Sequence, residues 1–429
     1  MPSVAGAGIV AGPFDNPGDN AIGERCACVK ELRVFLPDEL SGFLCREFGE
    51  LQVVRIVEGL FIRLQVVSGS MADGLWGVHR HVVCVDCQHR FVCGADARPV
   101  SPRAVCPNCG CAENDLRGQP DIEGDRLLVE KSIFSLRPPR RWEPVAFRDP
   151  GQSGRIVVKR VVGLPGESVQ IRQGDVYVDG RIQRKTLPQQ RAVAVLVHDA
   201  GHTPRANLAL PPRWDDDQVG TGWGGVEGRF AHPPGPGSGT VNWLEYRHWQ
   251  RLPGQPGEIL ETPVTNVRGY NQTRGQRAEN IHPVTDLLLS FRLVQTFGEG
   301  ELLVRATDGR EQFEVRMETG QGTYQVLKNG KPLGTAGRGQ LPAKRTDLHV
   351  EVSLFDRQFV LAFDGHPAGV WPYGPGDPEP NPTSRPLAIG SRGLSLQLRD
   401  LRVYRDVYYT HPVGVKGRWG LGPPVRLGT

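Results

Sequence analysis

The stretch RIVVKRVVGLPG, residues Arg155 to Gly166, predicts a β-strand that ends in a turn. Its isoleucine and valines favour an extended backbone, and Pro165-Gly166 is a turn pair. Because side chains alternate across a strand, Val157, Lys159 and Val161 share one face, which should be packed. Burial there would lower the pKa of the Lys159 amine. The alternative is that the long side chain reaches past the sheet edge into water.

Short β segments lie on both sides of this strand. Turn residues separate them, and Asp179-Gly180 between Val178 and Arg181 is typical of a two-residue hairpin. We therefore predict one compact antiparallel β unit from residue 124 onward. Its expected strands are Arg126–Val129, Val145–Phe147, Ile156–Val162, Ser168–Ile171 and Asp175–Val178.

Strand-like segments return at regular spacing in residues 281–410. Two further hairpin pairs, Asn329-Gly330 and Asp364-Gly365, separate some of them. Many short strands punctuated in this way predict a β-sandwich or jelly roll, so the fold class should be mainly β. The expected strands are Leu287–Leu293, Glu301–Thr307, Gln312–Met317, Tyr324–Leu327, His349–Leu354, Phe359–Phe363 and Leu396–Tyr404.

Residues 191–280 are rich in proline, glycine and acidic side chains, which predicts an irregular connecting region. Four tryptophans lie in it. We interpret them as covering the edge of a core, and a ligand-binding surface is the alternative. They are Trp214, Trp223, Trp243 and Trp249.

The amino-terminal residues 1–50 carry no hydrophobic periodicity and are expected to be disordered or irregular. Apolar residues at helical spacing in Leu51–Val67 predict an amphipathic helix. Packing on a core is the favoured placement, and lying on a membrane surface is the alternative. Arg55, Glu58 and Arg63 argue against this segment crossing a bilayer.

The composition excludes several classes of protein. With 54 glycines and 36 prolines in 429 residues, long helical arrays and coiled coils are not expected. The net charge is only +4, and the sequence contains no long run of residues with the same charge. We therefore expect no nucleic-acid partner. The sequence shows neither a secretory signal nor a long uncharged stretch, so no transmembrane helix is expected.

Two Cys-x-x-Cys pairs, Cys84/Cys87 and Cys106/Cys109, are separated by 18 residues. Each pair presents two thiolates on one side of a turn, and four thiolates close a tetrahedron around Zn²⁺. We predict a zinc ribbon in residues 81–112, with zinc in a structural role because no coordination position remains for water. Disulfides or free thiols are the alternative, and Cys93 and Cys111 are close enough in the sequence to compete.

A serine motif, Ser68-Gly69-Ser70-Met71, follows the apolar segment that ends at Val67. By itself, Ser-Gly-Ser indicates a turn. It gains a chemical interpretation beside Lys159, because a neutral lysine can accept the proton of a serine hydroxyl.

Taken together, these segments resemble the successive motifs of bacterial signal peptidase I. The resemblance covers roughly residues 64–187 and implies a catalytic core in residues 51–80 and 121–190. The cysteine segment interrupts this core, as in a zinc-ribbon branch of the family. The motifs that carry the resemblance are Ser68–Met71, Gly124–Lys131, Val145–Arg148, Val158–Glu167 and Gly174–Gly180.

The resemblance implies a serine endopeptidase that cleaves signal peptides from exported pre-proteins and needs no cofactor for catalysis. Ser70 would be the nucleophile and Lys159 the general base. The Ser70 N–H and the Ser68 hydroxyl would form the oxyanion hole. Four further residues would shape the core or the substrate-binding surface beside the dyad, namely Met71, Gly124, Asp125 and Arg160.

Members of this family cut pre-proteins after a signal sequence that commonly ends in Ala-x-Ala, because an extended peptide with small side chains fits shallow pockets. The resemblance also implies association with a membrane surface at the extracytoplasmic face. Residues 281–410 are similar to laminin-G-like or concanavalin-like sandwiches. For this sandwich, a structural or orienting role and the binding of sugar or peptide both remain open.

The sequence departs from the family pattern in three places. Ala72-Asp73-Gly74 follows Met71 where the family usually has a proline, and the amino-terminal membrane anchor is not seen. The final motif, Gly-Asp-Asn-Ser followed by Ser-x-Asp-Ser-Arg, does not occur, so residues 411–429 are expected to be an incomplete return to the core. A serine in that motif orients the lysine. A catalytically impaired relative and a peptide- or carbohydrate-binding interaction protein are therefore the alternative functions.

Overall fold

The computed structural model is mainly β and divides into two compact units. One unit contains Met1–Met71, Leu75–Gly77 and Glu123–Pro165, and the other contains Ala72–Gly74, Val78–Ile122 and Gly166–Thr429. The structure describes residues 7–10, 60–96, 99, 101–149, 154–205, 210–216, 222–234, 239–252, 255–267, 269–272, 281–343, 346–374, 379–410 and 425–426.

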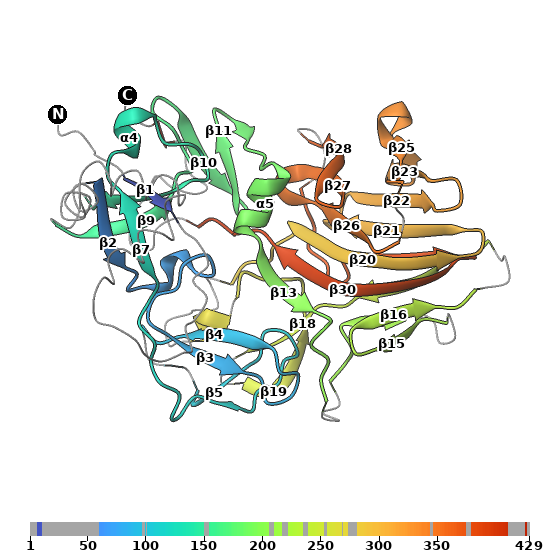
Figure 1. Cartoon of the computed structure of the whole chain (residues 1–429), viewed down its shortest axis with the longest axis horizontal. Coiled ribbons are helices and arrows are strands. Elements are labelled where there is room, and N and C mark those ends of the chain that lie inside the picture. The colour runs from blue at the N-terminus through green and yellow to red at the C-terminus, as the bar shows by residue number, and fades with distance from the viewer. Residues whose placement is uncertain are drawn as a thin grey trace, which may run out of the picture. The chain divides into compact units, whose positions relative to one another are not determined.

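An antiparallel five-stranded sheet forms the first unit, in the order β2-β7-β1-β8-β9 (Figure 1). Side chains from its strands form a small apolar core that includes Leu127, Val129 and Ala146. The strands are β1 (Ala7–Val10), β2 (Phe61–Gln65), β7 (Arg126–Glu130), β8 (Pro144–Arg148) and β9 (Ile156–Arg160), and the short helices are η1 (Gly69–Met71) and α4 (Ile133–Leu136).

The structure differs from two expectations for the amino-terminal part of the chain. Phe61–Gln65, within the predicted amphipathic helix, is strand β2 and pairs residue by residue with β7. Ile62 and Leu64 both pack on the core, so the alternation of a strand replaces the helical spacing. Residues 51–59 lie outside the described residues. Within the predicted irregular segment 1–50, the structure describes only Ala7–Val10, and these form β1 between β7 and β8.

The predicted single β unit after residue 124 is wrong. Its first three strands belong to the sheet of the first unit, whereas its last two belong to another sheet in the second unit. That sheet contains β10 (Ser168–Arg172), β11 (Asp175–Val178), β12 (Arg181–Ile182) and β31 (Val425–Arg426), the described part of residues 411–429. The Asp179-Gly180 hairpin is confirmed, because both residues have positive φ.

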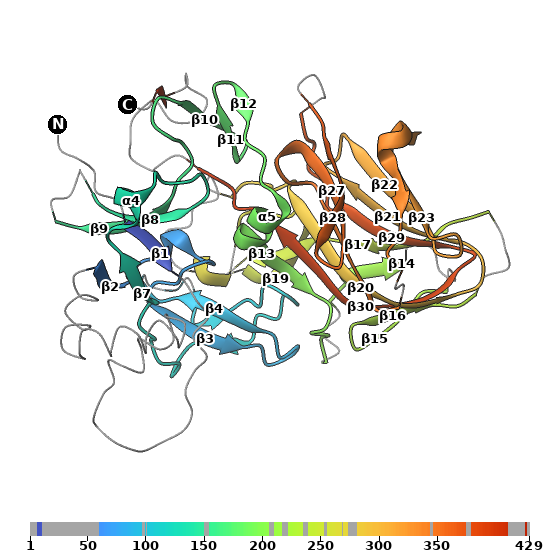
Figure 2. The same cartoon turned by 45° about the horizontal axis from the view of Figure 1, so that its top comes forward.

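The second unit contains a sandwich of two antiparallel sheets, which bury one continuous core between them (Figure 2). The first sheet contains β15 (Gly224–Val226), β16 (Arg229–His232), β30 (Ser395–Arg405), β20 (Leu287–Phe297), β26 (Leu348–Ser353), β27 (Gln358–Phe363), β28 (His366–Pro372) and β13 (Val195–Asp199). The second contains β14 (Trp214–Asp216), β17 (Asn242–Tyr246), β29 (Leu387–Arg392), β21 (Glu301–Thr307), β22 (Gln312–Glu318), β23 (Thr323–Lys328), β24 (Lys331–Pro332) and β25 (Arg338–Gln340).

The sandwich forms because its strands alternate buried apolar residues with polar ones. Along β22, Phe313, Val315 and Met317 are almost completely buried and face the core.

All seven strands expected in residues 281–410 are present. The hairpins at Asn329-Gly330 and Asp364-Gly365 are confirmed, again with positive φ at both positions.

The expectation of an irregular region in residues 191–280 is wrong. Strands β13, β15 and β16 extend one sheet of the sandwich, and β14 and β17 extend the other. Pairing with β29 and β30, much later in the chain, holds these segments extended despite their turn-rich composition. Trp214 and Trp249 are buried and Trp223 packs against the core, which confirms the core interpretation for these three tryptophans.

Three hairpins, each a separate two-stranded sheet, are also described in the second unit. Two of them carry the cysteine pairs at their turns, and the third is formed by β18 and β19. The strands are β3 (His79–Val83), β4 (Arg90–Gly94), β5 (Arg103–Ala104), β6 (Asn114–Asp115), β18 (Trp249–Leu252) and β19 (Gln255–Glu261). The remaining helices are α5 (Leu187–Val193), η2 (Gly269–Asn271), η4 (Gly334–Gly337) and η5 (Phe355–Arg357).

Candidate active site and cysteine cluster

Ser70 lies on the single turn η1, which follows strand β2. The chain before it is tied to β7, because Val66 N–H donates to the Asp125 carbonyl over 2.9 Å. After it, Leu75 N–H donates to the Met71 carbonyl over 3.0 Å. Met71 packs against the apolar core while Ser70 is exposed. Packing of Met71 therefore holds the turn in place, and the Ser70 hydroxyl is accessible to solvent.

Lys159 lies on β9, opposite Val145 of β8. Its Nζ donates to Ser70 Oγ over 2.6 Å, so the two atoms lie within hydrogen-bonding distance. Of the two placements that the sequence left open for the lysine, the structure shows the one at the sheet edge and not the packed face. Lys159 is exposed, because β9 is at the edge of the described sheet and the alternate residue Val158 faces the core.

The electrostatics of Lys159 nevertheless favour the neutral amine more than in free lysine. Although the side chain as a whole is exposed, partial desolvation of the amine lowers its pKa from the ordinary value, and the positive charge of Arg155 lowers it further. Ser68 completes the group, because its hydroxyl donates to Ser70 Oγ over 3.4 Å. One amine and two hydroxyls therefore meet at this turn.

Two glycines allow other segments to pass very close to the serine turn. A Cβ on Gly124 would lie 1.8 Å from the Val66 carbonyl oxygen. A Cβ on Gly77 would lie 2.5 to 2.6 Å from three backbone atoms of Ser68. No side chain fits at either position without moving the backbone. Gly77 was missed by the sequence reasoning, since nothing in its local pattern reveals a contact with Ser68.

The remaining site candidates, Asp125 and Arg160, hold backbone segments. The Asp125 carboxylate accepts the Trp76 N–H at 2.8 Å, and the Asp125 N–H donates to the Trp76 carbonyl at 2.9 Å. Arg160 donates to the Trp142 carbonyl at 2.6 Å. Because it alternates with Lys159 along β9, it points to the opposite face. Asp125 thus supports the chain beside the serine turn, whereas Arg160 joins β9 to the loop before β8.

The four cysteines of the two Cys-x-x-Cys pairs converge in the second unit. All four are buried, and their Sγ atoms lie within 4.8 Å of one another. Cys84 and Cys109 are 3.6 Å apart, and Cys87 and Cys106 are 3.8 Å apart, distances too long for disulfide bonds. Each pair follows the first strand of a hairpin, so the two turns bring their sulfurs together.

Hydrogen bonds hold the two cysteine turns in register. Asn114 connects them, because its Oδ1 accepts the Val85 N–H at 3.0 Å and its Nδ2 donates to the Cys111 carbonyl at 2.8 Å. The Cys111 N–H donates to Cys109 Sγ over 3.5 Å. Hydrogen bonds from its sulfur neighbours lower the pKa of the Cys84 thiol, while burial raises that of Cys106. The cluster is thus a closed, sulfur-only site.

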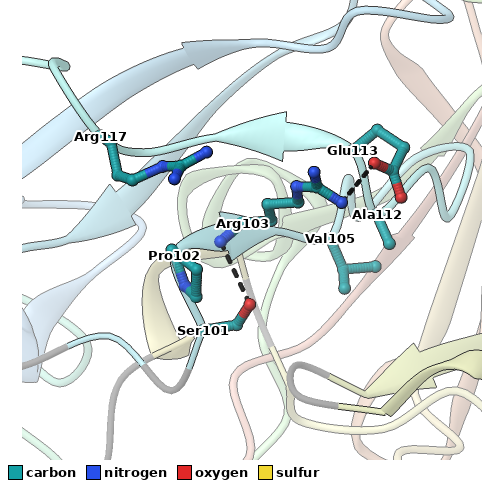
Figure 3. Close-up of a pocket in the computed structure, with 7 residues that line it drawn as sticks. All are labelled: Ser101, Pro102, Arg103, Val105, Ala112, Glu113 and Arg117. Atoms are coloured by element: carbon teal, nitrogen blue, oxygen red, sulfur yellow. Dashed lines mark hydrogen bonds and ion pairs between the residues drawn. The ribbon is translucent and has the colours of Figure 1, made fainter.

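A small hollow of about 280 Å³ lies beside the second cysteine hairpin (Figure 3). Its charged groups are already paired, since Arg103 contacts Glu113 at 2.7 Å and Arg117 contacts Asp115 at 2.8 Å. This hollow therefore offers no unpaired charge to a ligand. It is lined by Ser101, Pro102, Arg103, Val105, Ala112, Glu113 and Arg117.

A buried acidic cluster, absent from the sequence expectations, also lies in the second unit. Oxygens of Asp175, Asp286 and Asp356 lie within 4.8 Å of one another. Lys185 Nζ pairs with Asp356 at 2.6 Å and with Asp406 at 2.7 Å. One ammonium cannot neutralise four carboxylates, and burial raises the pKa of Asp175 to about 8 and that of Asp356 to about 6. These positions are too far apart in the sequence to suggest a cluster.

Among the helices that the structure describes, none is both long and apolar enough to cross a membrane.

Comparison with known proteins relates part of the chain to one family. Residues 119–213 match the family described as signal peptidase, peptidase S26, a range that includes Lys159 but begins after Ser70. The chain is 35% identical over 88 residues to a probable signal peptidase I-1 of Synechocystis, covering 18% of this chain and 45% of that protein. It is 31% identical over 80 residues to signal peptidase I V of Bacillus subtilis, covering 18% and 46%.

The chain thus spans less than half the length of these two relatives. The matches relate part of this chain to the signal peptidase family, and both relatives are described as signal peptidases I. Similar solved structures include the carbohydrate-binding module CBM66 of Bacillus subtilis, with a TM-score of 0.25, 9% identity, and coverage of 46% of this chain and 93% of that chain. The Caenorhabditis elegans galectin LEC-6 has a TM-score of 0.21, 11% identity, and coverage of 27% and 81%. These low scores add nothing to the fold described above.

Proposed function

We propose that this protein is a signal peptidase I-type serine endopeptidase that cleaves signal peptides from exported pre-proteins. The observation that carries the proposal is the 2.6 Å contact between Lys159 Nζ and Ser70 Oγ. A serine alone is a weak nucleophile and needs an adjacent base. The family matches in residues 119–213 supply independent support.

In the proposed reaction, neutral Lys159 takes the proton of the Ser70 hydroxyl while Oγ attacks the scissile carbonyl carbon. The carbonyl π electrons move to oxygen, and the resulting oxyanion accepts hydrogen bonds from the Ser70 N–H and the Ser68 hydroxyl. The C–N bond then breaks, and the leaving amine takes the proton from Lys159. Lys159, now neutral again, takes a proton from water while the water oxygen attacks the acyl carbon of the serine ester. The ester C–O bond then breaks, and Lys159 gives the proton to Ser70 Oγ.

The substrate proposed for this chemistry is an extended peptide with small residues before the cut, such as Ala-x-Ala. In the described sheet, β2 and β9 are the edge strands. Strand β2 leads to the turn with Ser70, and β9 contains Lys159. An extended peptide can add to such an edge through main-chain hydrogen bonds. By the family resemblance, we place this activity at a membrane surface on the extracytoplasmic side.

We further propose that Cys84, Cys87, Cys106 and Cys109 hold one structural zinc ion. A tetrahedron with Zn–S bonds of about 2.3 Å has edges of about 3.8 Å, close to the observed sulfur separations of 3.6 and 3.8 Å. Burial of all four thiols fits a structural site. Zinc would cross-link the two hairpins, and the four thiolates would leave no position for a catalytic water.

The test is cleavage of an Ala-x-Ala signal-peptide substrate by the full chain in detergent or lipid vesicles. Ser70→Ala and Lys159→Ala should each abolish cleavage while the protein stays folded. Lys131→Ala, which removes another lysine of the same unit, is the matched control and should cleave normally. Cleavage that persists in either dyad variant would exclude this mechanism. Failure of the unmodified chain to cleave would overturn the activity and favour a catalytically impaired relative.

A further inference from the structure

Two arginines beside the second cysteine turn form no ion pair with an acidic group among the described residues. Arg213 is only 8% exposed, and its guanidinium lies 3.9 Å from the centroid of the Trp249 ring. Its Nη1 donates to the Trp249 carbonyl, and its Nε is buried without a hydrogen-bond partner. A cation buried in this way is costly unless an opposite charge lies near it.

Arg251, which is half-buried, also contacts the backbone of the turn. Its Nη1 donates to the Gly110 carbonyl over 3.4 Å, and its Nε is also buried without a partner. Among the described residues, neither Arg213 nor Arg251 has a carboxylate within ion-pair distance. By contrast, Arg305 also stacks on a tryptophan, at 4.1 Å, but pairs with Glu245 at 2.9 Å.

The cysteine turn and the two arginines belong to one packed region. A Cβ on Gly110 would lie 2.4 Å from the Trp249 ring, so the turn rests directly on the ring that also stacks with Arg213. Cys109 and Arg213 line the same cavity of about 540 Å³. Gly110 is the residue between Cys109 and Cys111, so the stack runs from the cysteine turn through Trp249 to the guanidinium.

Asp215, Asp216 and Glu227 line the same cavity as Arg213, but among the described residues none of them forms an ion pair with either arginine. The Asp199 carboxylate pairs with Arg402 at 2.9 Å, and Asp86 Oδ1 accepts the Arg205 N–H at 2.8 Å. Burial lowers the pKa of His198 to about 3, so this imidazole is neutral. Burial also lowers the pKa of Arg213, and negative charge on Tyr246, Cys109 and Cys106 acts in the opposite direction.

Four thiolates around one Zn²⁺ carry a net charge of about −2, which is the complement of two guanidinium groups. We propose that Arg213 and Arg251 supply the counter-charge of the zinc-thiolate centre, and thereby link metal occupancy to the packing of this edge of the sandwich. This inference rests on the zinc site proposed above. Loss of the metal, with reprotonation of the thiols, would leave both guanidinium groups without compensation.

Zinc affinity provides the first test. The full chain and its Arg213→Met, Arg213→Lys, Arg251→Met and Arg305→Met variants are titrated against a competing chelator, and bound zinc is measured directly. Loss of the charge at residue 213 or 251 should weaken zinc binding by about 10- to 100-fold, the usual effect of removing an outer partner of a metal site. Arg213→Lys should retain most of the affinity, and Arg305→Met should match the unmodified chain.

Equal losses in Arg213→Met and Arg213→Lys would assign the effect to packing and overturn the proposal, as would unchanged affinity in both methionine variants. An unmodified chain that binds no zinc would instead refute the metal site itself, so the two failures are distinguishable.

Thermal melting provides the second test. Chelation should lower the Tm of the unmodified chain more than that of Arg213→Met, because the variant has one fewer uncompensated charge once zinc is lost. An identical decrease in the two proteins would contradict the linkage. If Arg213→Met does not fold, the same comparison with Arg251→Met decides the question.

Discussion

The backbone of Gly77 lies directly against the backbone of Ser68, two residues before the proposed nucleophile, with no room for a Cβ between them. Gly77→Ala should therefore displace the serine turn and lower kcat about 10- to 100-fold with little change in KM, since small misplacements of catalytic groups are costly. Steady-state kinetics and a melting curve check this expectation. Gly224→Ala, where a Cβ would meet nothing within 4 Å, is the control. A kcat equal to that of the control would remove Gly77 from the positioning of Ser70.

The Ser68 hydroxyl, 3.4 Å from Ser70 Oγ, is expected to donate to the oxyanion. Ser68→Ala should lower kcat by about 10²- to 10³-fold, the typical cost of one oxyanion-hole donor. Ser68→Thr keeps the hydroxyl and should recover much of the rate. The comparison uses kcat on the same peptide for both variants. Equal rates for alanine and threonine would argue against the oxyanion role.

The pH dependence of cleavage should report Lys159. Only its neutral amine can act as the base, so kcat/KM should rise with pH through the pKa of Lys159, which lies below the ordinary value of 10.5. Arg155→Met removes a repulsive positive charge, so the pKa should increase and the rising limb should move to higher pH. Arg148→Met is the matched control on the neighbouring strand. A limb that does not move would show that Arg155 has no influence on the base.

Zinc should copurify with the full chain at about one equivalent, as expected for a single four-thiolate site. Cys106→Ser should lose the metal and lower the Tm, because the ion would no longer join the two hairpins. Cys93→Ser is the control, since Cys93 is buried but lies outside the four-sulfur cluster. Metal content by elemental analysis and thermal melting are the measurements. A folded, metal-free protein with unchanged Tm would refute the site.

The stability of the second unit should decrease as the pH rises from about 5 to 8. The folded state raises the pKa of Asp175 from 3.8 to about 8, so it binds this proton more tightly than the unfolded chain does. The contribution is complete below pH 3.8 and is lost as the pH approaches 8. Asp175→Asn should flatten the decrease when Tm is measured against pH.

Asp115→Asn is the matched control for this pH series. The pKa of Asp115 is lowered to about 2 by Arg117, so this carboxyl is ionised in both states over the tested range. Its substitution should leave the slope unchanged. If Asp175→Asn and Asp115→Asn give the same slope, the buried cluster does not control the pH dependence.

Much of the fold could be predicted because its signals are local. Strand-like segments at regular spacing identified the sandwich strands, and the Asp-Gly and Asn-Gly pairs identified hairpins, since these turns need residues that tolerate positive φ. The segment 191–280 was mispredicted because its strands are extended only by pairing with β29 and β30. Phe61–Gln65 was mispredicted because a short apolar segment fits both helical and strand spacing until its partner β7 is known.

The sequence by itself determined which atoms could do chemistry: a serine motif, a lysine within a strand, and four cysteines at zinc-ligand spacing. Only the tertiary structure decided the distances between them and their surroundings. It placed Lys159 Nζ 2.6 Å from Ser70 Oγ, but on an exposed edge strand instead of a packed face. It also placed Gly77 against Ser68 and Arg213 on Trp249. Such contacts join residues that are distant in the chain, so their energies depend on packing and desolvation, which no local pattern of residues encodes.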